Sequence, residues 1–157
     1  MAGTPIVDIR SIDLDHVMIS ADEVGRLNPQ CGPMRQLDHI IWHNDDGTQA
    51  LAVKHVTEDE FWVPYHIPGR PLMPGVLMIE AAAQLSSILY KIRAKDARFV
   101  GFTRCDDVIF RGQVVPGDTL YLMISAVSHT PRRQVTRAQA RVNEKLVFEA
   151  TITGMVV

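Results

Sequence analysis

The stretch from His66 to Gln84, HIPGRPLMPGVLMIEAAAQ, joins two segments of opposite character. Its first ten residues include three prolines and two glycines, which exclude a regular helix or a central strand. From Gly75 onward the chain is apolar on nearly every side, and a helix of this kind is buried by the rest of its domain. Pro74 suits the first turn of a helix because its missing N–H would have no partner there. We therefore predict a rigid loop followed by a central helix from Gly75 to about Ala94.

Most of the remaining chain has the pattern of short strands joined by turns. The predicted strands cover residues 37–42, 49–56, 98–110, 120–126, 134–142 and 146–152. Ser20 and Glu23 form a capping-box pattern, which predicts a short helix ending near Leu27. The short turns between the last strands indicate antiparallel pairing. The predicted fold class is α+β, an antiparallel sheet wrapped around one long helix, in a single domain over residues 1–157, of which residues 1–19 form an arm of uncertain structure.

Composition is that of an ordinary globular protein, with 46% apolar and 22% charged residues. The longest apolar run is interrupted by Glu80 and Gln84, so we expect no membrane span, which needs about 18 uninterrupted apolar residues. The first residues are acidic and lack the pattern of a secretion signal. Cys31 and Cys105 follow no disulfide or metal spacing. These features predict a reduced, cytoplasmic protein.

Charge is unevenly distributed along the chain. Residues 1–90 contain 12 acidic and 5 basic side chains, whereas residues 91–157 contain 11 basic and 6 acidic ones. The basic half could bind an acidic partner, although an ordinary solvated surface is the favoured interpretation. Nucleic acid is not an expected partner, because no aromatic residues are interleaved with the arginines.

Glu80 is the first candidate for catalysis. Glu80, Gln84 and Ser87 share one face of the otherwise apolar predicted helix. A carboxyl group in apolar surroundings favours its protonated form, which can donate a proton near neutral pH. Taken alone, such a glutamate is more often bonded to the backbone or to an arginine in a subunit contact.

His66 is the second candidate, since a loop braced by proline and glycine would hold an imidazole in the fixed position that a general base needs. A single loop histidine more often has a structural role. The helix start adds a third element, because the free N–H groups of Gly75 and Val76 suit a carbonyl oxygen that gains negative charge. An acid, a base and a polarised carbonyl indicate proton abstraction beside a carbonyl with loss of a β leaving group. No metal is expected, because the spacing of His39 and His43 along a strand is poor for ligation.

The stretch from His66 to Gln84 closely resembles the signature of the β-hydroxyacyl-(acyl carrier protein) dehydratases of fatty acid synthesis. Residues 54–61, KHVTEDEF, and residues 110–118, FRGQVVPGD, resemble further blocks of that family. The resemblance extends from about Ser20 to the C-terminus. It implies a hotdog fold, a sheet wrapped around one long helix, in agreement with the fold class predicted above.

The resemblance also implies roles for individual residues. His66 and Glu80 would be the catalytic pair, and Gly75 an oxyanion donor through its backbone N–H group. Beside these roles we predict Val76 as a second oxyanion donor, and Tyr65, Leu72 and Gln84 as substrate-binding residues. The family's dimers share each site between subunits and are often assembled into hexamers. The expected substrate is a 3-hydroxyacyl thioester on acyl carrier protein or coenzyme A, and no cofactor is expected beyond the phosphopantetheine arm that belongs to this substrate.

Two features of the motif bear on specificity. A sister branch that also isomerises the double bond has aspartate at the carboxylate position, so Glu80 favours the branch that only dehydrates. The family usually has Gly-His-Phe-Pro where this chain has Tyr65-His66-Ile67-Pro68, which indicates a divergent paralogue. The alternatives are a thioesterase-type hotdog protein, which would need a carboxylate that activates water, and a non-catalytic protein that binds acyl thioesters.

Overall fold

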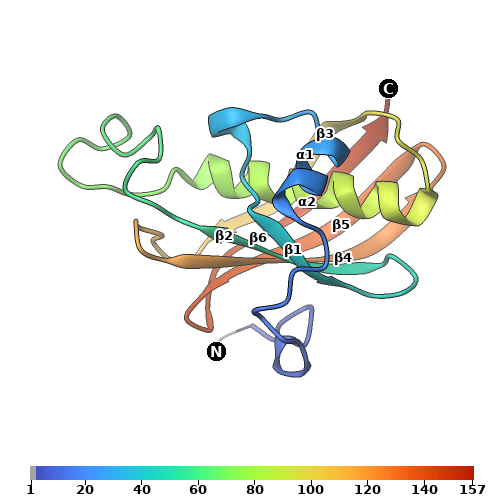
Figure 1. Ribbon diagram of the computed structural model, residues 1–157, viewed down its shortest axis with the longest axis horizontal. Helices are drawn as coiled ribbons and strands as arrows, with labels where there is room; N and C mark the ends of the chain where they lie inside the picture. The colour runs from blue at the N-terminus through green and yellow to red at the C-terminus, as the bar shows by residue number, and fades with distance from the viewer. Residues whose placement is uncertain (1–2) are drawn as a thin grey trace.

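The structure is a computed structural model that describes residues 3–157. A six-stranded antiparallel sheet, in the order β1-β2-β4-β5-β6-β3, curves around one long helix, α2 (Figure 1). The elements are η1 (Ile9–Ser11), α1 (Ala21–Leu27), η2 (Gly32–Met34), β1 (His39–His43), β2 (Gln49–His55), α2 (Gly75–Ala94), β3 (Val100–Phe110), β4 (Thr119–Thr130), β5 (Arg133–Val142) and β6 (Lys145–Val156). This arrangement is the predicted hotdog fold, and the antiparallel pairing of β4, β5 and β6 is confirmed.

Helix α2 begins at Gly75 and ends at Ala94, as predicted. Lys95 stops it by adopting a left-handed conformation with a φ of 50°. By length and composition alone α2 could cross a membrane, so the expectation that Glu80 and Gln84 exclude a span on those grounds is wrong. However, 61% of its most apolar window is buried within the fold, which is typical of the core helix of a globular domain.

The sheet is apolar on both faces at its β1, β2 and β4 side. On β2, Ala50 and Ala52 face the main core around α2, whereas Leu51 and Val53 belong to a second apolar cluster. Residues of the N-terminal arm cover this second cluster from the side opposite α2 (Figure 1). The arm, whose structure the sequence left undecided, is therefore part of the fold from Gly3 onward, and its residues 1 and 2 lie outside the described residues.

The α1 helix and the segment after it cover the side of α2 that faces away from the sheet (Figure 1). The predicted capping box is present: Ser20 Oγ accepts the Glu23 N–H, and Glu23 Oε2 accepts the Ser20 N–H. Asn28 Nδ2 then donates to the backbone oxygen of Gln84 at 2.9 Å, and Lys91 Nζ donates to that of Leu27. Burial lowers the pKa of Lys91, because the charged form is poorly solvated there.

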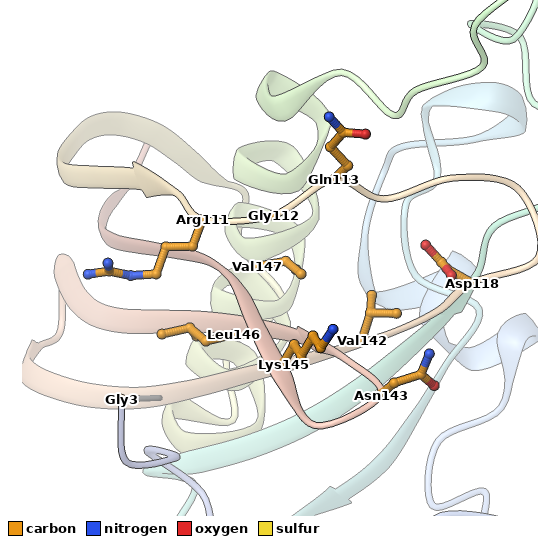
Figure 2. A pocket seen from close by; sticks show the side chains of 10 residues that line it. All are labelled: Gly3, Arg111, Gly112, Gln113, Asp118, Val142, Asn143, Lys145, Leu146 and Val147. Carbon is orange, nitrogen blue, oxygen red and sulfur yellow. The ribbon is translucent and has the colours of Figure 1, made fainter. Parts of the chain in front are cut away.

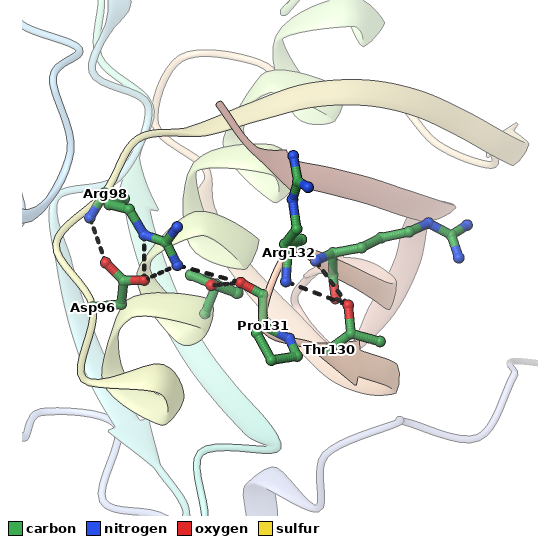
Figure 3. A network of polar contacts seen from close by, with 7 residues as sticks. Asp96, Arg98, Thr130, Pro131 and Arg132 are labelled. Atoms are coloured by element: carbon green, nitrogen blue, oxygen red, sulfur yellow. Dashed lines mark hydrogen bonds and ion pairs between the residues drawn. The ribbon is translucent and has the colours of Figure 1, made fainter.

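The C-terminal end of α2 is tied to the turn between β4 and β5 (Figure 3). Tyr90 Oη and Arg98 Nη2 both donate to the backbone oxygen of Pro131, at 2.8 and 3.4 Å. Arg98 is itself held by Asp96, to which its Nε donates at 2.7 Å. These contacts fix one end of the helix, so that the other end, which starts at Gly75, has a defined position relative to the sheet.

Candidate active site

His66 lies on the segment between β2 and α2, which extends beyond the N-terminal end of α2 (Figure 1). Trp62 is buried in the main core, and its backbone oxygen accepts the N–H groups of Tyr65 and His66, at 3.1 and 2.8 Å. At the other end of the segment, the Met73 N–H donates to the backbone oxygen of Val114 at 2.8 Å. The loop is thus anchored on both sides of His66, while the imidazole itself is exposed.

One hydrogen bond determines which nitrogen of His66 can act as a base. Nδ1 lies 2.7 Å from the backbone oxygen of Leu72. A carbonyl oxygen can only accept, so in the neutral imidazole Nδ1 carries the proton and Nε2 keeps its lone pair. Leu72, predicted to bind substrate, therefore contributes its backbone oxygen to the orientation of the base.

Glu80 lies in the second turn of α2 and is half-buried, less enclosed than the sequence suggested. Its Oε1 accepts a hydrogen bond of 2.9 Å from Gln84 Nε2, one helical turn later. Gln84 Nε2 also donates to the backbone oxygen of Met34 at 2.7 Å, and Gln84 Oε1 accepts the Gln36 N–H at 2.9 Å. With Oε1 held in this way, Oε2 is the oxygen of Glu80 that remains available for chemistry.

Gln84, a predicted substrate-binding residue, makes its contacts within the chain. Its side chain is 2% exposed, and both of its amide hydrogens are used within the chain. This geometry favours a role in orienting Glu80 over the predicted contact with substrate. The sequence analysis recognised that Gln84 and Glu80 share a helix face, but it had no signal for the segment at Met34 and Gln36 that completes the network.

A small cavity of about 140 Å³ borders Glu80 and continues along α2 to Ser87, which confirms that these two residues share a face. Phe99 and Phe102 line its other side. Gln30 also lines it, and Gln30 Oε1 is buried without a hydrogen-bond donor among the described residues. The space beside Glu80 is therefore lined by both apolar and polar side chains.

The N-terminus of α2 is open. Pro74 provides no side-chain cap, and the first N–H groups of a helix have no partner inside it. The ring of Phe110 packs against Gly75 so closely that a Cβ at this position would lie 2.7 Å from it. A side chain at this position would force the ring of Phe110 to shift. Val76 is exposed beside it.

The predicted substrate-binding residue Tyr65 projects from the loop with 81% of its surface exposed. It directly precedes His66, so its position beside the base is given by the chain itself. Within residues 3–157, no hydrogen bond joins His66 to Glu80, and His66 does not line the cavity that borders Glu80. One copy of the chain therefore presents the two predicted catalytic groups separately.

The larger grooves lie away from these residues. A groove of about 580 Å³ separates the segment after β3 from the turn between β5 and β6, and none of the predicted site residues lines it (Figure 2). In the part of the chain that is described, no three His, Cys, Asp or Glu side chains are grouped to hold a metal ion. His39 is partly buried, and its burial lowers its pKa, opposed by Asp38 and assisted by His55.

Much of the basic second half of the chain is engaged internally. Arg98, Arg104 and Arg111 form ion pairs with Asp96, Asp106 and Glu149. Arg141 is buried and donates to the backbone oxygens of Gly3 and Glu144. This use of the arginines supports the interpretation of an ordinary solvated surface over that of a binding face for an acidic partner.

The sequence of this chain is similar to those of known proteins. The model of the FabA-like domain matches residues 28–151. The 3-hydroxyacyl-(acyl-carrier-protein) dehydratase FabZ of Desulforamulus reducens is 34% identical over 136 residues, which cover 86% of this chain and 95% of the relative. FabZ of Herpetosiphon aurantiacus is 34% identical over 142 residues, covering 89% of this chain and 92% of the relative.

Solved structures show the same fold at lower identity. The dehydratase heterocomplex ApeI:P from Xenorhabdus doucetiae has a TM-score of 0.73 at 16% identity and covers 85% of this chain and 90% of its own. Cj0977, a sigma28-regulated virulence protein from Campylobacter jejuni, has a TM-score of 0.65 at 17% identity, with 89% and 94% covered. Since the family model spans most of the sequence and the relatives match nearly their full length, the chain belongs to the FabA-like family of 3-hydroxyacyl-(acyl-carrier-protein) dehydratases.

Proposed function

We propose that this protein removes water from 3-hydroxyacyl thioesters to give trans-2-enoyl thioesters in fatty acid or related lipid synthesis. The observation that carries the proposal is the orientation of His66 within a motif of the matched family. Its Nδ1–H is bonded to the Leu72 carbonyl, which leaves Nε2 free to accept a proton. Glu80, with Oε1 held by Gln84, supplies the complementary acid through Oε2.

In the proposed reaction, Nε2 of His66 takes a proton from C2 of the substrate. The electron pair of that C–H bond forms the C2–C3 double bond as the C3–O bond breaks. Protonated Glu80 donates its proton to the departing hydroxyl group, which leaves as water. The backbone N–H groups of Gly75 and Val76, at the open start of α2, stabilise the negative charge that develops on the thioester oxygen.

The substrate's thioester is proposed to be carried by acyl carrier protein or coenzyme A, with no cofactor beyond the phosphopantetheine arm of that carrier. The protein is proposed to act in the cytoplasm. Tyr65, which is exposed and directly precedes His66, is proposed to narrow the entry of the acyl chain, and Leu72 is proposed to contact that chain.

The proposed assembly is a homodimer with shared sites, which can assemble further into a hexamer. Two observations support it. The edge strand β3 and its flanks carry several exposed apolar side chains, namely Phe99, Phe102, Ile109 and Phe110. An exposed apolar edge strand is suited to pairing with another chain. A partner bound there would also cover the cavity beside Glu80, which Phe99 and Phe102 line.

The test is hydration of a crotonyl thioester by the purified protein, followed through the loss of enoyl absorbance. We expect turnover by the wild type and losses on the order of 10²-fold or more for His66→Ala and for Glu80→Gln. Release of free thiol without hydration would favour the thioesterase alternative. No reaction with either the coenzyme A or the carrier-protein thioester would favour a non-catalytic binding protein.

A further inference from the structure

Lys54 occupies an unusual position for a charged residue. It lies on β2 in the alternating set with Ala50, Ala52 and Val56, all of which belong to the main core. Lys54 is itself buried. A lysine at a core-facing position is costly unless its ammonium group is paired.

Its partner is Glu60, on the segment that leads from β2 to His66. Lys54 Nζ lies 2.8 Å from Glu60 Oε1, with side-chain exposures of only 5% and 12%. In every other ion pair among the described residues, one partner is at least 46% exposed. The Lys54–Glu60 pair is therefore the one that is withdrawn from solvent in the described part of the chain.

A buried ion pair adds little net stability, because desolvation of both charges offsets their attraction. Such a pair can instead hold two segments of the chain in one defined position relative to each other. This pair ties the irregular segment that follows β2 back to the sheet at Glu60, six residues before His66 along the sequence.

Short contacts connect Glu60 to the base. The Val63 N–H donates to the Glu60 backbone oxygen at 3.0 Å, and buried Trp62 lies between these two residues. The backbone oxygen of Trp62 in turn accepts the His66 N–H at 2.8 Å. The position of Glu60 thus determines the path of the backbone that carries His66.

We infer that the buried Lys54–Glu60 pair is a positioning pair for His66, which holds the loop so that the imidazole meets the substrate in one geometry. The effect of this pair on turnover depends on the proposed function. A displacement of about 1 Å at a reacting group can cost roughly 10²-fold in rate, so the pair can matter for turnover without touching the substrate.

Other charged side chains near the Lys54–Glu60 pair could replace a lost partner, and this affects the choice of variants. Arg35 and Asp59 line the same groove as Lys54 and Glu60. Arg35 could approach Glu60 if Lys54 were removed, and Asp59 already accepts a hydrogen bond from Thr57 Oγ1. Both halves of the pair must therefore be tested, as Lys54→Met and Glu60→Gln.

For both variants we expect kcat for hydration of a crotonyl thioester to fall about 10- to 100-fold, with KM changed less than about threefold. Lys54→Arg, which keeps the charge, should recover part of the loss. The matched control is Arg10→Met, which breaks the exposed Arg10–Asp8 pair on the N-terminal arm and should leave kcat unchanged. Wild-type kcat in both Lys54→Met and Glu60→Gln overturns the inference.

A spectroscopic measurement separates positioning from stability and from the proposed function. The imidazole Cε1–H signal of His66, assigned by its loss in His66→Ala, should be a single sharp line in the wild type. It should broaden or split in Lys54→Met and Glu60→Gln at temperatures well below unfolding, while the signals of His39 and His129 stay unchanged. An unchanged His66 signal in both variants contradicts the inference even if the wild type turns over no thioester.

If a single variant does not fold, Lys54→Met combined with Glu60→Leu removes both charges together and keeps the site apolar. This double variant should fold and show the same broadened His66 signal. A double variant that folds and retains both wild-type kcat and a sharp signal excludes a positioning role.

Discussion

Gln84 shows how one side chain can organise a site without contacting the substrate. It bridges Glu80 to the segment at Met34 and Gln36. Gln84→Met removes the bond to Glu80 and leaves the Met34 oxygen and the Gln36 N–H without partners, at a cost of about 1–3 kcal/mol in the free energy of unfolding. We expect turnover of a crotonyl thioester to fall as well, since Oε1 of Glu80 is no longer held.

Ser87→Ala is the matched control for Gln84→Met. Ser87 lies on the same helix face and borders the cavity beside Glu80. Gln84→Met should show lower turnover and a lower free energy of unfolding in urea than Ser87→Ala. Equal turnover by Gln84→Met and the wild type would show that Glu80 needs no such support.

Glu149 provides a pH-dependent contribution to stability. The hydrogen bond of 2.6 Å from Arg111 Nε lowers the pKa of Glu149, against an opposing effect of burial and with help from Gln139. Because the pKa in the folded state lies below its ordinary value of 4.5, this contribution is present above that pH and is lost as the pH falls through the folded-state pKa.

Urea unfolding at pH 7 and at pH 4 checks this. From pH 7 to pH 4, the free energy of unfolding should fall more for the wild type than for Glu149→Gln, which has no carboxyl group to protonate at this position. An equal loss in the two proteins would mean that the ion pair, in which Arg111 is 46% exposed, contributes nothing measurable.

At the level of residues, the sequence indicates candidates where the residue type itself carries the chemistry. His66 and Glu80 could be selected because an imidazole on a rigid loop and a carboxyl group in an apolar helix are uncommon. The Leu72 oxygen that orients His66 and the Met34 oxygen that holds Gln84 beside Glu80 could not be predicted, since backbone oxygens leave no mark on the sequence. The role of Lys54 could not be predicted either, because its contact with Glu60 depends on the path of an irregular loop.

Among the elements, those with local signals were predictable. Pro74 marks the start of α2, and the capping box marks that of α1. The strand predicted over residues 98–110 is present as β3, with a register shift between Asp106 and Ile109 and Asp107 at a φ of 51°. The N-terminal arm was not predictable, because apart from the single turn of η1 it forms no regular helix or strand and is ordered by contacts with the outer face of the sheet.

Val7 tests whether this arm is part of the folded core. It is 2% exposed and packs with Ile41, Leu51 and Met123. Val7→Ala should lower the free energy of unfolding by about 1–2 kcal/mol, because it leaves a cavity in this cluster. Val17→Ala, at a 49% exposed position of the same arm, should leave it nearly unchanged. Equal unfolding curves for the two variants would show that the arm is not ordered on the sheet in solution.

At the scale of the whole molecule, the two catalytic candidates belong to different parts of one chain. His66 lies on the loop that projects past the start of α2, and Glu80 lies in the helix beside the edge formed by β3 (Figure 1). A two-fold dimer through the β3 edge would bring the same surfaces of two chains together. The loop of one chain could then supply the base to the acid of the other.

Mixed dimers test this directly. His66→Ala and Glu80→Gln are each expected to be inactive, but a dimer with one chain of each kind contains one site with both native groups. Random reassembly of equal amounts after unfolding should therefore restore about one quarter of wild-type turnover, since half of the dimers are mixed and each has one good site. Differently tagged chains would confirm that mixed dimers form. If mixed dimers form and remain inactive, His66 and Glu80 act within one chain, and the loop must move toward α2 before the reaction.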